Sequence, residues 1–267
     1  MIDSKKFIAT EKRRSVRGFS LTEAIMVIVI TGILAGMVAM FIQKPVQGFF
    51  DTARRAALVD AADTALRRIS RDLREALPNS VRVSGTALEF LHVRSAGRYR
   101  EQVAPAPPPG DPLDFTGADT SFDVLGPPVS VQAGDSVVVY NLGIAGASAY
   151  SGATAITDVR RVYSGVGGLL ANIAITSTAA LPFASPARRF QIVDTPVSYV
   201  CAGNQMRRYA GYAILPAQPV PPAGSGALIA DKLTTCSFAY TSGPSERAAL
   251  VTLNLALTDG GAAKSDF

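Results

Sequence analysis

The sequence predicts an α+β protein in which a long N-terminal helix packs on a mostly antiparallel β-sheet domain. An uncharged apolar run extends from Ala24 to Gln43, which is long enough for a helix of several turns. Between Leu58 and Leu77 the apolar residues recur at steps of three or four, which indicates an amphipathic helix. From Val81 onward, short apolar segments are separated by turn residues, which is typical of strands.

Residues 1–18 form a basic leader that carries most of the net charge of the chain. The 267 residues include 26 Lys and Arg and 21 Asp and Glu, which gives a net charge of +5. Six of these bases and two of these acids lie in the leader, so residues 19–267 have a net charge of only +1. This small charge on the body of the chain argues against nucleic acid as a partner.

Residues 19–44 are predicted to be a transmembrane helix. The uncharged run has about the length that a helix needs to cross a hydrocarbon core of roughly 30 Å. Because six positive charges precede it and only Lys44 follows closely, we expect a cytoplasmic N-terminus and export of the remainder. No clear small-residue cleavage site precedes Pro45, so the span is expected to be retained.

Glu23 is an acid at the start of this run, and the sequence leaves two interpretations of it open. The carboxylate lies shallow enough in the membrane to stay hydrated, or it has a charged partner. Cleavage between Gly18 and Phe19 would create an α-amine four residues before Glu23. Pairing two isolated charges in apolar surroundings is favourable because either one alone is costly. In a helical stack, Glu23 of one subunit would then neutralise the amine of another.

Residues 45–77 are predicted to be the amphipathic continuation of the helix. Pro45 and Gly48 interrupt the pattern, so we expect a kink there. The remaining faces carry six arginines and five acids, which indicates a solvated or intersubunit surface. Pro78 is expected to end the helix. The apolar stripe consists of Leu58, Ala62, Leu66, Ile69, Leu73 and Leu77.

Residues 78–267 are predicted to form a β-rich globular domain. Two proline-rich stretches, 104–112 and 216–226, are expected to be exposed loops. Cys201 and Cys236 lie in two predicted strands and are a candidate disulfide in an exported domain, with two buried free thiols as the alternative. The predicted strands are 81–84, 87–93, 136–142, 188–195, 197–202, 206–214, 234–240 and 248–258.

The N-terminal segment resembles the class III signal of type IV pilins and type II secretion pseudopilins. The resemblance implies a pilin-like fold, cleavage after Gly18 by a prepilin peptidase and N-methylation of Phe19. It implies other pilins, minor pilins and an inner-membrane assembly platform as partners. It also implies residence in the bacterial inner membrane with a periplasmic C-terminal domain, followed by entry into a pilus. The matching residues are Gly18, Phe19, Ser20, Leu21, Thr22 and Glu23.

The body of the chain is similar to the MshO family of minor pilins of MSHA-pilus biogenesis. The similarity is carried by residues 47–83, 113–127, 133–143 and 185–203 and extends to about Leu257. Such proteins are also similar to the J-type minor pseudopilins of type II secretion. They usually finish with another strand, whereas this chain ends in "DGGAAKSDF", so we expect a difference at the last sheet edge.

The sequence contains no recognisable catalytic motif. His92 is the only histidine and lies in a predicted strand, so we expect it to be structural. There is no Gly-x-Ser-x-Gly elbow, Cys-x-x-Cys pair, Walker sequence or metal-binding histidine pair, so neither an enzyme nor a cofactor is expected. One acidic loop has oxygen ligands that suit calcium, although its spacing fits no EF-hand and turn-forming roles are favoured. Its members are Asp111, Asp114, Asp119 and Asp123.

These observations predict a minor pilin-like subunit of an MSHA-type type IV pilus. Its globular part is bulky for a shaft subunit, so a tip or initiating complex is the expected position. A J-type minor pseudopilin of a type II secretion system is the alternative within the same machinery. A static, signal-anchored periplasmic binding protein is the alternative from another class.

Overall fold

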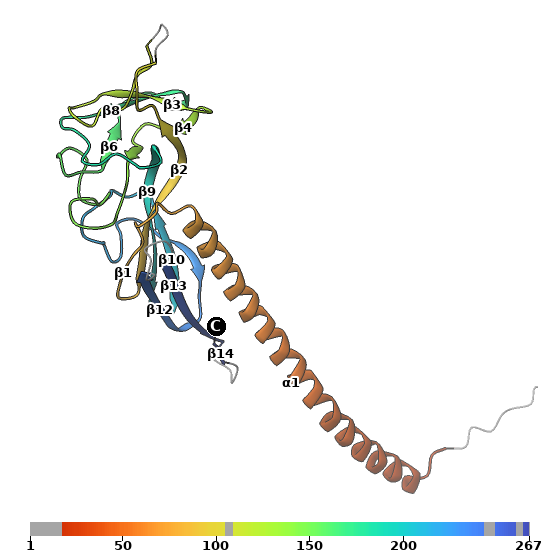
Figure 1. The fold of residues 1–267 in the computed structure, drawn as a ribbon. Coiled ribbons are helices and arrows are strands. Elements are labelled where there is room, and N and C mark those ends of the chain that lie inside the picture. The colour runs from red at the N-terminus through yellow and green to blue at the C-terminus, as the bar shows by residue number, and fades with distance from the viewer. Residues whose placement is uncertain (1–17, 105–108, 243–248, 260–263, 267) are drawn as a thin grey trace, which may run out of the picture. The chain divides into compact units, whose positions relative to one another are not determined.

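The computed structural model describes residues 18–104, 109–242, 249–259 and 264–266. The chain divides into two compact units, residues 1–53 and residues 54–267, and each is described by itself. Helix α1 (Leu21–Arg74) contributes its first part to one unit and its last part to the other. The predicted architecture is confirmed: a long apolar N-terminal helix is combined with a mostly antiparallel β domain (Figure 1). Residues 1–17 of the basic leader lie outside the described residues.

The described part of the first unit is almost entirely helix α1. Its large apolar side chains between Leu21 and Ile42 are 49–81% exposed, so nothing in the unit covers them. By length and composition, α1 is the one helix in the described part of the chain that could cross a membrane. The helix continues through Pro45 without a break in secondary structure, and the kink expected there stays a prediction.

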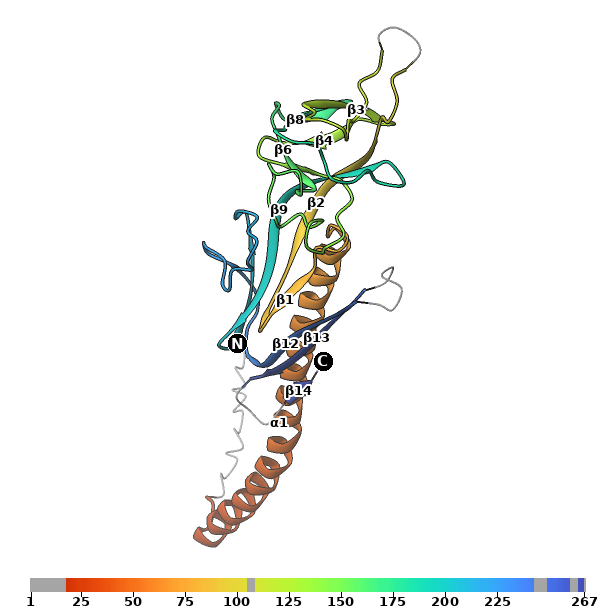
Figure 2. The same cartoon turned by 60° about the vertical axis from the view of Figure 1, so that its left-hand side comes forward.

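The second unit contains three antiparallel sheets (Figures 1 and 2). A nine-stranded sheet has the order β1-β2-β3-β8-β6-β5-β9-β10-β11, with β2 also paired to β9. A three-stranded sheet has the order β12-β13-β14, and β4 pairs with β7. The strands are β1 (Arg82–Ser84), β2 (Ala87–Tyr99), β3 (Ser121–Leu125), β4 (Val129–Val131), β5 (Ser136–Val138), β6 (Arg160–Tyr163), β7 (Gly168–Leu170), β8 (Asn172–Thr176), β9 (Arg189–Ala202), β10 (Gln205–Ala210), β11 (Ala227–Ala230), β12 (Leu233–Ser242), β13 (Ala249–Thr258) and β14 (Lys264–Asp266).

The last part of α1 packs into a core formed with both larger sheets. Leu58, Ala62, Ala65 and Ile69 are buried there among side chains from β2, β9, β10, β12 and β13. The predicted stripe is therefore shifted slightly, because Ala65 is fully buried whereas Leu66 and Leu73 are only partly buried. A second core of described residues contains no side chain from α1. It includes buried aromatic rings of the nine-stranded sheet, such as Phe122 and Phe190.

The helix ends at Arg74, three residues before the predicted end at Leu77. Pairing with β2 is the physical reason. The N–H of Leu77 donates to the carbonyl of Leu91 (2.7 Å), and the N–H of Val93 donates to the carbonyl of Glu75 (2.8 Å). These bonds satisfy the backbone groups that leave the helix, so the chain exits before Pro78 is reached.

The longest predicted strands are present, and several differ in extent. Segments 188–195 and 197–202, which were predicted as two strands, form the single strand β9. Pro196, which separates the two segments, lies where the β2–β9 register shifts. The last sheet edge, where a difference was expected, is closed by β14, which pairs with β13 within the segment "DGGAAKSDF". The described parts of 104–112 and 216–226 contain neither helix nor strand, in line with the predicted loops.

The predicted disulfide joins Cys201 in β9 to Cys236 in β12. Their Cα atoms are 6.2 Å apart, within the range that disulfides span. Because β9 belongs to the nine-stranded sheet and β12 to the three-stranded sheet, the bond links the two sheets covalently beside the helix-containing core. The closed segment is 35 residues long.

We predict that the double variant Cys201→Ala/Cys236→Ala loses about 3–4 kcal/mol of unfolding free energy, because opening this loop increases the entropy of the unfolded chain. Denaturant unfolding of the detergent-solubilised protein under oxidising conditions measures the loss. Reductant should bring the wild-type protein to the stability of the variant and leave the variant unchanged. A loss below about 1 kcal/mol would contradict the prediction.

Candidate processing and assembly site

Ser20 and Glu23 form a reciprocal hydrogen-bonded pair at the start of α1. The N–H of Glu23 donates to Ser20 Oγ (3.2 Å), and the N–H of Ser20 donates to Glu23 Oε2 (3.3 Å). Ser20 Oγ also donates to the same carboxylate oxygen (3.3 Å). Because the helix begins at Leu21, Ser20 is the N-cap and Glu23 the third helical residue, which is the arrangement of a capping box.

The capping box gives Glu23 a partner within its own chain. It satisfies N–H groups that have no acceptor within the helix, and a negative charge in the first turn is favoured by the helix dipole. Sequence reasoning missed this role of Ser20, although the spacing Ser-x-x-Glu was its signal. Among the described residues, every hydrogen bond to the Glu23 carboxylate goes to Oε2, so Oε1 is left without a donor.

The Gly18–Phe19 peptide lies outside the helix, immediately before the cap. Residues 18–20 have no regular secondary structure, and a Cβ built on Gly18 would meet no described atom within 4 Å. The Phe19 side chain is 77% exposed. A peptide outside regular secondary structure, with no described atom crowding Gly18, is accessible to a protease, so the geometry suits cleavage at this bond.

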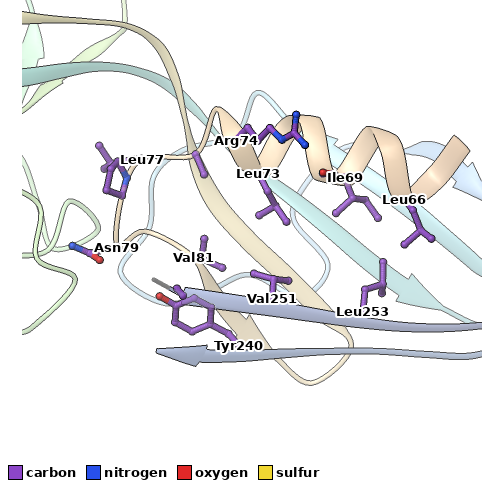
Figure 3. A pocket seen from close by; sticks show the side chains of 14 residues that line it. Leu66, Ile69, Leu73, Arg74, Leu77, Asn79, Val81, Tyr240, Val251 and Leu253 are labelled. Carbon is purple, nitrogen blue, oxygen red and sulfur yellow. The ribbon is translucent and has the colours of Figure 1, made fainter. Parts of the chain in front are cut away.

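A groove of about 620 Å³ lies between the end of α1 and the β12–β13 hairpin. Figure 3 shows that leucine and isoleucine side chains of the helix face apolar side chains of β13 across it. Arg74 is the only charged residue among the described lining residues. Facing side chains include Leu66, Ile69, Leu73, Val251 and Leu253.

His92 links the exit of α1 to the central strands. Its Nδ1 lies 2.8 Å from Asp194 Oδ1, and its Nε2 lies 3.1 Å from Glu75 Oε2. Arg94 also faces this cluster and bonds to Asp194 and Asp135. Burial of the ring lowers the pKa of His92, but the hydrogen bonds and charges of Asp194 and Glu75 outweigh burial and raise that pKa above 6.5. These contacts suit a structural role.

The four aspartates proposed for calcium are engaged in local hydrogen bonds. Asp114 Oδ1 accepts from the N–H and hydroxyl of Thr116 (both 2.7 Å), which lowers the pKa of Asp114. Asp119 Oδ2 accepts the N–H of Asp114, and Asp111 Oδ2 accepts the hydroxyl of Ser121. In the part of the chain that the structure describes, no group of three or more acidic, His or Cys side chains is arranged to hold a metal ion.

Asp123 closes the same loop from strand β3. Its carboxylate accepts from Asn172 Nδ2 (3.1 Å), from the N–H of Asp111 (2.9 Å) and from Arg100 Nε (3.1 Å). The hydrogen bond from Asn172, followed by those from Asp111 and Arg100, lowers the pKa of Asp123. Through these contacts, all four aspartates accept hydrogen bonds within or next to the loop.

Residues 13–39 match the family model described as the prokaryotic N-terminal methylation motif. The match includes Gly18, Phe19 and Glu23 and covers about a tenth of the chain. It supports a type IV pilin-like or pseudopilin subunit that is processed by a prepilin peptidase and assembles with other pilins. Together with the uncovered apolar helix, it fits anchoring in a membrane. No curated protein and no solved structure matches the chain.

The raised pKa of His92 predicts that its contribution to stability is full below pH about 6.5 and is lost as pH rises through the folded-state pKa. We therefore expect His92→Gln to lose more stability relative to wild type at pH 5.5–6 than at pH 8.5–9. Thermal melts of both proteins across this range measure the difference. A difference that does not change with pH would contradict the prediction.

Proposed function

We propose that this chain is a minor pilin-like subunit of an MSHA-type type IV pilus, stored in the inner membrane and drawn into a growing filament. The methylation motif, which extends into the uncovered apolar part of helix α1, is the observation that carries the proposal. The resemblance of residues 47–83, 113–127, 133–143 and 185–203 to MshO-type minor pilins supports the assignment to this pilus. A J-type pseudopilin shares the same N-terminal features, and the gene neighbourhood distinguishes the two.

In this proposal the N-terminus is cytoplasmic and the β domain is periplasmic. The basic leader before the span supports this orientation. The Cys201–Cys236 disulfide also supports it, because structural disulfides persist in the oxidising periplasm and are rare in the cytosol. The bulky β domain suits a scarce position, at the tip or in an initiating complex, better than a position repeated along the shaft.

Glu23 is proposed to act twice, once in each state of the subunit. In the single chain, Oε2 closes the capping box with Ser20. After cleavage, the amine of Phe19 lies one residue before Ser20, and an amine from a neighbouring subunit can approach Oε1 without displacing the cap. Neutralising both charges removes the cost of keeping an isolated amine or carboxylate in apolar surroundings. Glu23 therefore favours a defined register between neighbouring helices.

We predict that mature protein recovered from native cells begins at Phe19, is 249 residues long and carries one methyl group on its α-amine. Mass spectrometry of the N-terminal peptide tests this directly. A strain without prepilin peptidase is the control and should yield the full chain. An unmethylated protein that retains residues 1–18 in peptidase-positive cells would contradict processing and favour a static anchor.

We predict that Glu23→Gln and Glu23→Val both leave cleavage largely intact and both lower incorporation into filaments by more than about tenfold, because both remove the charge that pairs with the amine. The glutamine variant is the matched control, since a Gln at this position retains the capping interaction. Sheared pilus fractions are compared by immunoblot. Normal incorporation of Glu23→Gln would show that capping is sufficient and that the charge pair is not required.

A further inference from the structure

We propose that Arg98 and Arg189, together with the pocket beside Arg189, bind a small hydroxylated carboxylate of the hexuronate class. The two arginines are direct partners in the β2–β9 ladder. The N–H of Tyr99 donates to the carbonyl of Arg188 (2.9 Å), a bond that flanks a non-hydrogen-bonded pair. Directly opposed side chains in such a pair lie on the same face of the sheet and especially close together.

This pair is unusual because both arginines are exposed and neither guanidinium group has a hydrogen-bond or ion-pair partner among the described residues. Like charges that face each other across a ladder destabilise a sheet, so such a pair calls for an explanation. Between residues 75 and 259, every other described lysine and arginine side chain has an oxygen acceptor. Arg161, for example, is fully buried and donates to backbone carbonyls. Glu101, close to Arg98 in sequence, is paired with Arg188 (2.6 Å).

A pocket of about 210 Å³ lies directly beside Arg189. Arg189 and Gln191 both line it, because they are two residues apart on one face of β9, whereas Phe190 points to the opposite face and is buried. No described residue hydrogen bonds to the amide of Gln191 or the hydroxyl of Tyr140. These groups are available to the hydroxyls of a ligand, while the guanidinium forks match a carboxylate.

The backbone around this pocket is strained. Four non-glycine residues in the described part of the chain have positive φ angles, and three of them belong to this region. Asn79 (61°) and Tyr140 (57°) line the pocket, and Arg188 (56°) immediately precedes Arg189. Left-handed conformations of non-glycine residues concentrate at binding sites, where the surrounding structure holds side chains in position. The strain therefore supports a binding role for this pocket.

The size and chemistry of the pocket favour a single sugar acid over a longer acidic peptide. Its volume is below the range of about 300–1,000 Å³ typical of sites for larger ligands. Its lining is mostly apolar, which suits the C–H face of a sugar ring, and Leu77, Pro78 and Leu142 contribute to it. The amide of Gln191, the hydroxyl of Tyr140 and the guanidinium of Arg189 supply a few polar groups for sugar hydroxyls and one carboxylate. The site is formed entirely within the second unit and does not depend on how the subunit assembles.

Titration of the detergent-solubilised full chain with D-glucuronate, followed by ligand-observed NMR, tests the proposal. D-glucose is the matched neutral ligand and should bind at least about tenfold more weakly, because it lacks the carboxylate. Arg98→Gln and Arg189→Gln should each weaken glucuronate binding by about tenfold. Arg71→Gln is the control, since it removes the same charge from an exposed, unpaired arginine on α1 and should leave binding unchanged.

The unliganded variants provide a second, independent measurement. Removing either arginine relieves the cross-strand repulsion, so the melting temperature of Arg98→Gln and Arg189→Gln should equal or exceed that of wild type while affinity falls. The proposal is overturned if glucuronate shows no saturable binding, or if glucose binds equally well. It is also overturned if the variants melt earlier and bind normally. Tighter binding of a tetraglutamate peptide than of glucuronate would reject the sugar acid in favour of an acidic peptide.

Discussion

The β domain depends on one narrow helical surface, where Leu58, Ala62, Ala65 and Ile69 are buried against strands of two separate sheets. Ala62 and Ala65, which are 1% and 0% exposed, contribute small methyl groups to the centre of this surface. Asp72 then fixes the helix to the nine-stranded sheet, because its Oδ2 accepts from Arg208 Nε (2.6 Å) and from the Tyr199 hydroxyl (2.8 Å). Apolar packing gives the surface its stability, and this partly buried acid gives it a defined position.

Both ends of α1 are determined by local hydrogen bonds, and each end has a different consequence. At the start, the capping box separates the Gly18–Phe19 peptide, which has no regular secondary structure, from a helix that begins at Leu21. At the other end, pairing of Glu75 and Leu77 with β2 turns the chain directly into the sheet. A helix bounded in this way has a fixed length. The uncovered apolar side chains near its start require a non-aqueous partner, either lipid or the helices of other subunits.

The sequence was most informative where a pattern is local and repeated. The apolar run, the helical stripe and the alternation in β2, β9, β12 and β13 predicted the main elements. Several strands of three to five residues, such as β4 and β7, were missed because they exist only through pairing with distant segments. Ser20 and Glu23 were both visible in the signal, yet the cap was overlooked. The Arg98–Arg189 pair joins residues 91 positions apart and becomes visible only from the strand register.

The capping box also changes how a charge pair at Glu23 must be understood. A flexible carboxylate would lose side-chain freedom when it binds an amine, and this loss opposes association. Here Ser20 has already fixed the Glu23 side chain through Oε2, so less freedom remains to be lost when Oε1 accepts an amine. In this view Ser20 is a positioning residue for assembly as well as a helix cap. The serine and the glutamate then act as one unit, in which the cap holds the acid in place before the partner arrives.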